Sequence, residues 1–406
     1  MFTIKRNKTT LAIAYLIFGI WFTGNDMDAQ KVINLNEAVQ IATTNNPVVK
    51  NAGLKVESAM ALASSFPNFR PTELSFDYGQ IHSSIYTKTF EISQNLGSPF
   101  TQWQNMKLEK EKVQFSKSDQ AITLKQFTAL VKKAYMKWLY DSLLVKITEQ
   151  EASSCGDFEN FYPEKSMTPD SLMQEKASAQ SLYADVQRRL YIAQEEVRYS
   201  TNQMQQILGI SETPALADST MELYAIEAFR QGNDKFQPYT YDDYYEQMQK
   251  VKNCQVNVER AKLTPEITAG YFVQDINHVS GFKGYVLGLS IPLIFNSQTA
   301  KIKEARINQK ITANETEYQK LYLKKDIENL QIRLNQYFVN ISYFRENALD
   351  EAETIVQSSI NKLIDKKISY PVYLGNITKA YGIKSSYLAA IRLYNETAIE
   401  LEHYLN

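Results

Sequence analysis

The sequence predicts a mainly α-helical fold with a four-strand β contribution, and three observations lead to this prediction. Long stretches without glycine or proline, at 101–155, 171–208 and 298–370, are typical of long helices. Four shorter segments alternate apolar side chains with small or polar ones, as strands do. The order helix, strand, strand, long helix, tip, long helix occurs twice along the chain. We therefore expect a duplicated unit rather than several unrelated domains.

The N-terminus has the composition of an export signal. Three basic residues, Lys5, Arg6 and Lys8, precede an apolar run of about 12 residues, and small and polar residues follow up to Ala29. Residues 1–29 are therefore expected to be a signal peptide that is cleaved after Ala29. A retained membrane anchor is the alternative, which the shortness of the apolar run disfavours.

The helical segments are too long for a globular core. The stretch 298–370, as a single helix of about 70 residues, would extend about 105 Å. Its apolar residues recur every three or four positions, which is the stripe that a helix buries against neighbouring helices. The sequence thus predicts long helices in a coiled-coil arrangement at about 98–160, 169–209, 297–366 and 371–405.

Strands are expected at about 72–80, 85–96, 265–275 and 283–294. Periodicity alone leaves two interpretations equally open: the wall of an outer-membrane β-barrel, or two hairpins that each pack one face on helices. Four strands cannot close a barrel, and open sheet edges in lipid leave backbone groups without partners. A sheet in the membrane would therefore have to share one barrel with other copies of the chain.

The two halves of the chain match in residue type over a period of about 200 residues. The segment "PTELSFDYGQ" from Pro71 is similar to "PEITAGYFVQ" from Pro265. We assign a first structural repeat to 30–210, a linker or equatorial segment to 211–238 and a second structural repeat to 239–406.

Two stretches carry a resemblance to a known family. The first is "LTPEITAGYFVQ" followed by "GFKGYVLGLSIPLIFNSQTAKIKEARI", and the second is the C-terminal "KKISYPVYLGNITKAYGIKSSYLAAIRLYNETAIELEHYL". Together with the order and spacing of the other elements from Ile33 onward, they make the chain resemble the TolC family of outer-membrane efflux proteins. Within that family the resemblance is to the heavy-metal branch.

The resemblance implies a TolC-like fold and a homotrimer in the outer membrane of a Gram-negative bacterium, with the helical part in the periplasm. Each copy would give four strands to one barrel in outer-membrane lipid. The channel would be a passive exit duct for heavy-metal cations or small toxic compounds, driven by an inner-membrane RND pump through a periplasmic adaptor (membrane fusion protein). Two alternatives stay open: a type I secretion channel, and a soluble periplasmic coiled-coil scaffold.

Three acidic residues are candidates for lining the pore. Glu73, Asp77 and Glu91 alternate with the apolar residues of the first expected hairpin, so they belong to its polar face. In a trimer they would form rings of negative charge that favour cations. The alternative is that they only hydrate the pore.

Charged residues at the helix tips are candidates for docking the adaptor: Lys165, Asp365, Lys366 and Lys367. A solvated helix end is the alternative interpretation of this cluster. The resemblance also implies a glycine at each tip, where this chain has Lys165 and Lys366. Family members often close this end with acidic residues, but the corresponding positions here are Val372 and Gly375. The resemblance therefore assigns no gate residues.

Other patterns exclude several functions. The formal net charge of −1 disfavours nucleic-acid binding, which requires a basic excess. Cys155 and Cys254 are expected near opposite ends of the long helices, too far apart for a disulfide. His82, His278 and His403 are isolated from one another and from thiols. We therefore expect no metal site, no cofactor and no enzymatic activity.

Overall fold

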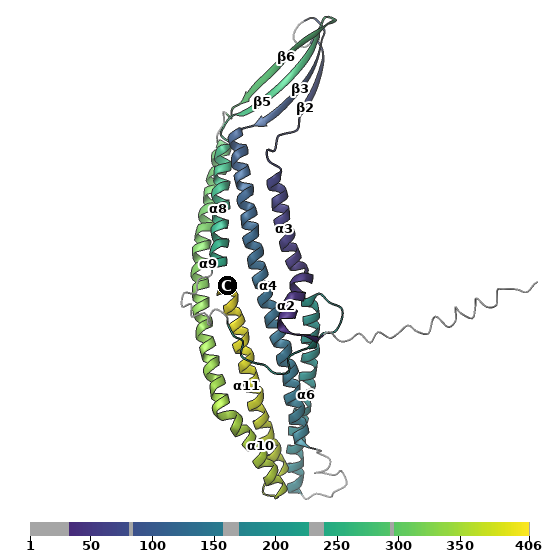
Figure 1. Ribbon diagram of the computed structural model, residues 1–406, viewed down its shortest axis with the longest axis vertical. Coiled ribbons are helices and arrows are strands. Elements are labelled where there is room, and N and C mark those ends of the chain that lie inside the picture. Colours follow the sequence, from purple (N-terminus) through teal and green to yellow (C-terminus); the bar gives the residue numbers. More distant parts are fainter. Residues whose placement is uncertain (1–31, 81–83, 157–169, 227–238, 293–295, 406) are drawn as a thin grey trace, which may run out of the picture.

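The computed structural model describes residues 32–80, 84–156, 170–226, 239–292 and 296–405. These residues form an elongated molecule with a small sheet at one end and helix tips at the other (Figure 1). The expected signal peptide, His82, Lys165 and residues 227–238 of the expected linker lie outside the described residues. The predicted mainly α-helical fold with a four-strand β contribution is confirmed, and the four strands form one sheet.

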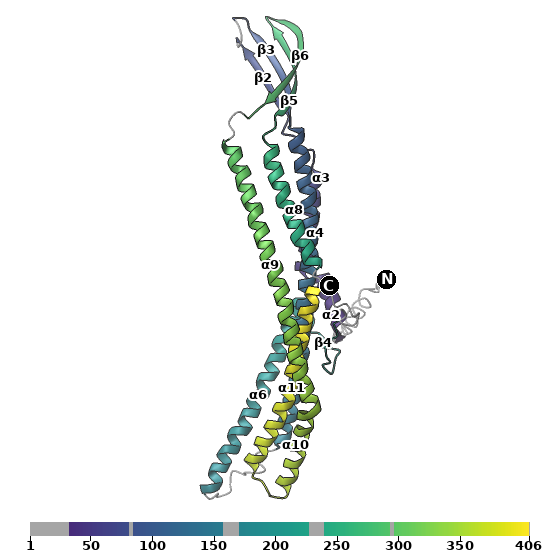
Figure 2. The same ribbon diagram turned by 90° about the vertical axis from the view of Figure 1, so that its left-hand side faces the viewer.

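Helices run along the length of the molecule (Figures 1 and 2). Their bounds are α2 (Leu35–Asn45), α3 (Pro47–Ser64), α4 (Pro99–Cys155), α6 (Asp170–Leu208), α8 (Tyr239–Ala261), α9 (Asn296–Tyr343), α10 (Leu349–Ile364) and α11 (Tyr370–Leu405). The π-helical segment η1 (Phe344–Ala348) joins α9 to α10. Helix α4 has 57 residues and is therefore about 85 Å long. Among the described helices, none is apolar over a stretch long enough to span a membrane.

Local sequence signals set the ends of the helices. Asn34 and Glu37 form a capping box at the start of α2, with reciprocal hydrogen bonds of 2.9 and 3.0 Å. Helix α4 begins at Pro99, directly after its N-cap residue Ser98, where proline's missing N–H costs no hydrogen bond. It ends before Gly156, whose φ of 71° suits glycine and does not continue a helix.

The two halves of the chain lie side by side and pack against each other along the length of the molecule. Helix α4 extends from the sheet to the tip, with α3 beside its upper part and α6 beside its lower part (Figure 1). In the second half, α9 and α10 together cover the same length, with α8 packed along the upper part and α11 along the lower part. Helices α8 and α11 both contact α4, so the second half packs directly on the first.

The sheet combines one hairpin from each half of the chain. Its strands are β2 (Glu73–Gly79), β3 (Thr87–Gly97), β5 (Glu266–Ile276) and β6 (Val279–Ser290). All neighbours are antiparallel, in the order β2-β3-β5-β6, so β2 and β6 form the two edges. A second, parallel pairing of two residues each joins β1 (Val32–Ile33) to β4 (Ala215–Leu216) midway along the molecule.

Buried side chains are distributed along the molecule rather than gathered in one core. One cluster surrounds Tyr135 and Ile341 midway along the helices, and another surrounds Leu374 near the tip. Cys155 and Cys254 belong to different clusters, and both are buried free thiols, as expected. This distribution is that of packed long helices, each of which buries only a stripe.

Two elements differ from the sequence prediction. The strand expected at 283–294 spans Val279–Ser290, because Asn277 and His278 make a two-residue turn with φ values of 49° and 68°. The single helix expected at 297–366 is interrupted by η1, after which α10 ends at Ile364. The helix that leads to the tip is therefore α-helical on either side of a five-residue π-helical segment.

Candidate functional site

The sheet has one face that is mostly small and polar, here called the polar face. Residues directly opposite each other in an antiparallel pair share a face, so the register assigns every side chain. Glu73, Asp77 and Glu91 all lie on this face, opposite Ser93, Thr89 and Ser75. The polar face continues through β5 and β6 with Thr268, Gly270, Gln274, Gly284 and Gly288, and its apolar members include Phe272, Ile276, Phe282 and Val286.

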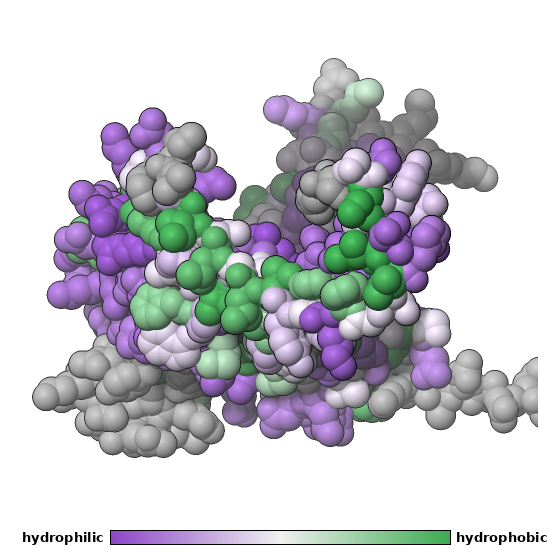
Figure 3. Space-filling view, turned by 90° about the horizontal axis from the view of Figure 1, so that it is seen from above, coloured by the Kyte–Doolittle hydropathy of each residue, from purple (hydrophilic) through white to green (hydrophobic). Residues whose placement is uncertain are grey.

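The other face of the sheet, here called the apolar face, is hydrophobic, and no other part of the described chain covers it. Its apolar side chains that are largely exposed are Leu74, Phe76, Tyr78, Phe90, Ile92, Tyr285, Leu287 and Leu289. Leu287 is 83% exposed, although burying such a side chain would be worth about 1.5–3 kcal/mol. Figure 3, which looks onto the sheet end, shows a band of hydrophobic side chains across the molecule. Monomeric soluble proteins rarely leave such a continuous apolar surface in water.

Charged residues lie on the apolar face at the outer end of the sheet, near the hairpin turns. Lys88 and Asp275 lie on this face in the row of Tyr78, and Lys283 lies in the next row, opposite Val273. His278 is exposed in the turn between β5 and β6. In the described residues, no group of three or more His, Cys, Asp or Glu side chains could hold a metal ion.

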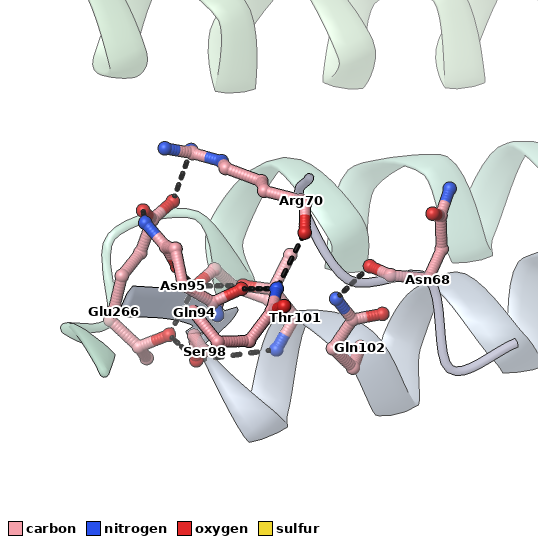
Figure 4. Close-up of polar contacts among 11 residues, drawn as sticks. Asn68, Arg70, Gln94, Asn95, Ser98, Thr101, Gln102 and Glu266 are labelled. Atoms are coloured by element: carbon pink, nitrogen blue, oxygen red, sulfur yellow. Dashed lines mark hydrogen bonds and ion pairs between the residues drawn. The ribbon is translucent and has the colours of Figure 1, made fainter. Parts of the chain in front are cut away.

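A polar network fixes the inner end of the sheet to the helices (Figure 4). Glu266 on the polar face accepts hydrogen bonds from Arg70, at 2.9 Å, and from Asn95, at 3.2 Å. Ser98 and Thr264 share a hydrogen bond of 2.6 Å between the N-cap of α4 and the approach to β5. These bonds give partners to polar groups where the strand ladder stops. At this end β3 leads into α4 with only Ser98 between them.

Three tyrosines of α11 hold the C-terminal end of α4 at the opposite end of the molecule. The hydroxyl of Tyr370 donates to the Cys155 carbonyl at 2.6 Å, and that of Tyr373 donates to the Ser154 carbonyl at 2.5 Å. Tyr381 shares a hydrogen bond of 2.9 Å with the Ser154 hydroxyl. The last carbonyls of a helix lack partners within it, and the tyrosines supply them. We call Tyr370, Tyr373 and Tyr381 the tyrosine clamp.

The tyrosine clamp is buried beside a buried ion pair. The Glu151 carboxylate, 1% exposed, accepts two parallel bonds from the Arg189 guanidinium of α6, at 2.7 and 2.6 Å. These bonds raise the pKa of Arg189, and Asp185 adds a further contact at 3.1 Å. Burial, and then the Glu151 charge, raise the pKa of the nearby Cys155 thiol to about 12. Burial also raises the pKa of Tyr373, so its hydroxyl stays protonated as a donor.

The tip between α10 and α11 carries the exposed charges expected there. Asp365 caps the end of α10, and Lys367 forms an exposed ion pair with it at 2.8 Å. Lys366 has a φ of 54°, a left-handed conformation that glycine adopts more easily than lysine. Val372 and Gly375 are both exposed on α11, and no acidic residue occupies either position.

His403 is packed between two tyrosines rather than exposed at the end of the chain. Its Nε2 atom lies 2.6 Å from the Tyr241 hydroxyl of α8, and its ring also contacts Tyr404. Burial, followed by the charges of Lys125 and Lys133, lowers the pKa of His403. The contact with Tyr241 joins residues 162 positions apart, so no local sequence pattern predicts it.

No protein-family model and no curated protein sequence matches the chain. Its fold, however, is similar to that of several solved structures, and each similarity covers most of both chains. CusC, which forms a transmembrane channel, is 15% identical, with a TM-score of 0.75 over 92% of this chain and 92% of its own. A membrane protein from Pseudomonas aeruginosa is 11% identical, with a TM-score of 0.77 over 93% and 92%.

The outer-membrane channel MtrE of Neisseria gonorrhoeae, in its open state, is 13% identical, with a TM-score of 0.71 over 91% of this chain and 88% of its own. Identities this low establish a shared fold and leave individual residue roles open. The chain therefore has the TolC-like fold of outer-membrane channels.

Proposed function

We propose that the chain is the outer-membrane channel of a tripartite efflux system in a Gram-negative bacterium. The observation that carries the proposal is the two-faced sheet: an exposed apolar face backed by a face with Glu73, Asp77 and Glu91. An apolar face suits hydrocarbon and a polar face suits a water-filled lumen. The open edges at β2 and β6 would pair with other copies of the chain, which supports a homotrimer that shares one barrel.

The channel would be a passive exit duct without catalytic activity or a cofactor. After export by a signal peptide, its helices would extend through the periplasm toward an adaptor and an RND pump that supplies the transport energy. Asp365, Lys366 and Lys367 would belong to the adaptor-docking surface, together with Lys165. Heavy-metal cations or small toxic compounds are the proposed substrates, and rings of Glu73, Asp77 and Glu91 would favour cations.

Purified protein in a planar lipid bilayer is expected to conduct and to pass cations better than anions. The reversal potential in a salt gradient measures this preference, and Asp77→Asn with Glu91→Gln is expected to reduce it. A strain without the gene is expected to become sensitive to metal salts or to small toxic compounds. Trimers that never conduct would contradict the channel, and loss of a secreted polypeptide instead of resistance would favour type I secretion.

We further propose that the tyrosine clamp holds the tip closed. Each of its hydrogen bonds ties the end of α4 to α11, so the tip can splay only if they break. Val372 and Gly375 cannot form an acidic gate, whereas the clamp supplies an alternative closing contact. Its members lie next to the Glu151–Arg189 pair, which keeps the acceptor end of α4 in place.

The double variant Tyr370→Phe with Tyr373→Phe is expected to raise the single-channel open probability. It removes two donors worth about 0.5–1.5 kcal/mol each, which corresponds to roughly a 5- to 150-fold change in the opening equilibrium. Tyr191→Phe is the matched control, because Tyr191 is an exposed tyrosine of α6. An open probability that is the same in the double variant and the control would contradict the role of the clamp.

A further inference from the structure

Two lysines interrupt the apolar face of the sheet near its outer end. Lys88 on β3 and Lys283 on β6 are both exposed on this face, in adjacent rows. The rows nearer the helices, from that of Leu74 and Tyr285 to that of Leu289, carry no charged side chain. On a sheet that faces lipid, a lysine costs most at the middle of the bilayer and least near its edge. The two lysines therefore mark one edge of the surface that lipid would cover.

The depth of the lysines agrees with this assignment. From Lys283 to Leu289, in the last apolar row before the helices, β6 advances by 289 − 283 = 6 residues, or about 20 Å. The row of Lys88 lies two residues further out, at about 27 Å. The apolar band of a membrane barrel is about 25 Å tall, and tilted strands cross it obliquely. The flexible lysine stems would carry the ammonium groups over the remaining distance to the lipid headgroups.

Two tyrosines accompany Lys88 on the apolar face. The Lys88 ammonium lies 5.7 Å from the centre of the Tyr78 ring, and the rings of Tyr78 and Tyr86 are 6.0 Å apart. Tyr86 directly precedes β3, and its carbonyl accepts a bond from the Asn277 N–H at 3.1 Å, so the strand pairing continues to this residue. Both rings are exposed. Tyrosines are typical of the boundary between hydrocarbon and headgroups, where the ring is in an apolar layer and the hydroxyl in a wet one.

Neither lysine has a carboxylate partner in the described part of the chain. An ion pair at the inner end of the sheet joins Arg70 to Glu266, and none of the described ion pairs includes Lys88 or Lys283. Asp275 lies opposite Lys88 on the same face without forming such a pair. Two ammonium groups and one carboxylate leave this end of the apolar face with a net charge of 2 − 1 = +1 per chain. The surface thus suits an anion supplied from outside the chain.

We propose that this surface, here called the outer lysine surface (Tyr78, Tyr86, Lys88 and Lys283), binds a phosphorylated glycolipid of the outer leaflet. Strand β5 separates the two lysines, so they lie at least two strand spacings apart, about 10 Å. This spacing suits a disaccharide headgroup with a phosphate at each end better than a phospholipid with a single phosphate. The tyrosine rings would pack on the sugars and the acyl chains on the apolar face. The inference rests on the proposed function, because only insertion in the outer membrane brings the surface to this leaflet.

The test measures the binding of lipid A, the phosphorylated glycolipid part of lipopolysaccharide, to the purified full-length protein in detergent by native mass spectrometry. The double variant Lys88→Gln with Lys283→Gln is expected to raise the Kd for bisphosphorylated lipid A about 30-fold. Each lysine near an anionic lipid surface accounts for about a fivefold change. Asp275→Asn is expected to lower the Kd about fivefold, because it removes the carboxylate that repels the phosphates.

Lys303→Gln with Lys310→Gln is the matched control, because it removes two exposed lysines of α9, away from the sheet. It is expected to leave the Kd unchanged. An equal loss of affinity in both double variants would show that overall charge attracts the lipid, and would overturn the inference. Equal affinity of the parent protein for lipid A without its phosphates, or for phosphatidylethanolamine, would overturn it as well.

Conduction distinguishes failure of this inference from failure of the proposed function. Lys88 and Lys283 lie on the face opposite to Glu91, so their double variant is expected to conduct like the parent protein. Protein that conducts but shows no preference for phosphorylated lipid A would overturn the outer lysine surface alone. A parent protein that never conducts but shows this preference would contradict the proposed channel alone.

Discussion

Leu74→Arg is expected to prevent stable insertion into the outer membrane. Leu74 is 65% exposed on the apolar face of the sheet, in one row with Ile92, Tyr271 and Tyr285. An arginine on the lipid side near the middle of a bilayer costs about 2–4 kcal/mol, and a trimer would bear this cost three times. The same substitution in water would cost almost nothing, because the side chain is already exposed.

Ser75→Arg is the matched control, because Ser75 is the next residue of β2 but lies on the polar face, opposite Glu91. We expect this variant to reach the outer membrane in normal amounts, as its charge would face the lumen beside a carboxylate. Membrane fractionation and the yield of detergent-resistant oligomers measure both variants. If Leu74→Arg reached the outer membrane in the same amount as Ser75→Arg, the sheet would not face lipid, and the soluble scaffold would be favoured.

Fluorescence can test contact with lipid directly. Of the tryptophans in the described residues, Trp138 is buried and Trp103 is exposed. In a Trp103→Phe background, Leu287→Trp is expected to be quenched by brominated phospholipid, and Ser75→Trp by a small quencher dissolved in water. Quenching of both by the aqueous agent alone would show that neither face of the sheet contacts lipid.

Features that depend on local sequence were predictable. Periods of two and of three to four residues distinguish strands from helices because they reflect which side chains share a face. The alternation within each hairpin likewise places Glu73 and Asp77 on one face. The start of β6 was not predictable from turn residues, because Asn277 and His278 adopt positive φ without the glycine that usually marks such a turn.

Features that depend on distant contacts were not predictable. The tyrosine clamp joins Tyr373 to Ser154 across 219 positions, and nothing in either local segment indicates the other. The positions at which the resemblance implies a gate, Val372 and Gly375, lie on the exposed side of the same helix. The π-helical segment η1 was not predictable either, because the apolar residues around it keep spacings of three and four.

Arg189→Met is expected to loosen the tip more than any other single change proposed above. The methionine keeps the aliphatic stem of the side chain but leaves the Glu151 carboxylate buried without its partner. Removing one member of a buried ion pair costs about 3–5 kcal/mol, because the remaining charge stays out of water. The reverse change, Glu151→Gln, is expected to cost less, since the Arg189 side chain is 28% exposed and keeps Asp185.

Hydrogen exchange of the amides near the end of α4 and in the facing part of α6 measures this effect where it arises. A loss of 3–5 kcal/mol corresponds to protection that falls by roughly 150- to 5,000-fold. Arg198→Met is the matched control in the same helix: Arg198 is 75% exposed, and its pair with Glu195 is worth about 0.2–1 kcal/mol. Because the clamp acceptors Ser154 and Cys155 follow Glu151 in α4, the loosened tip is also expected to open more often. Unchanged protection in Arg189→Met would mean that apolar packing alone positions the end of α4, and the clamp would then not depend on the ion pair.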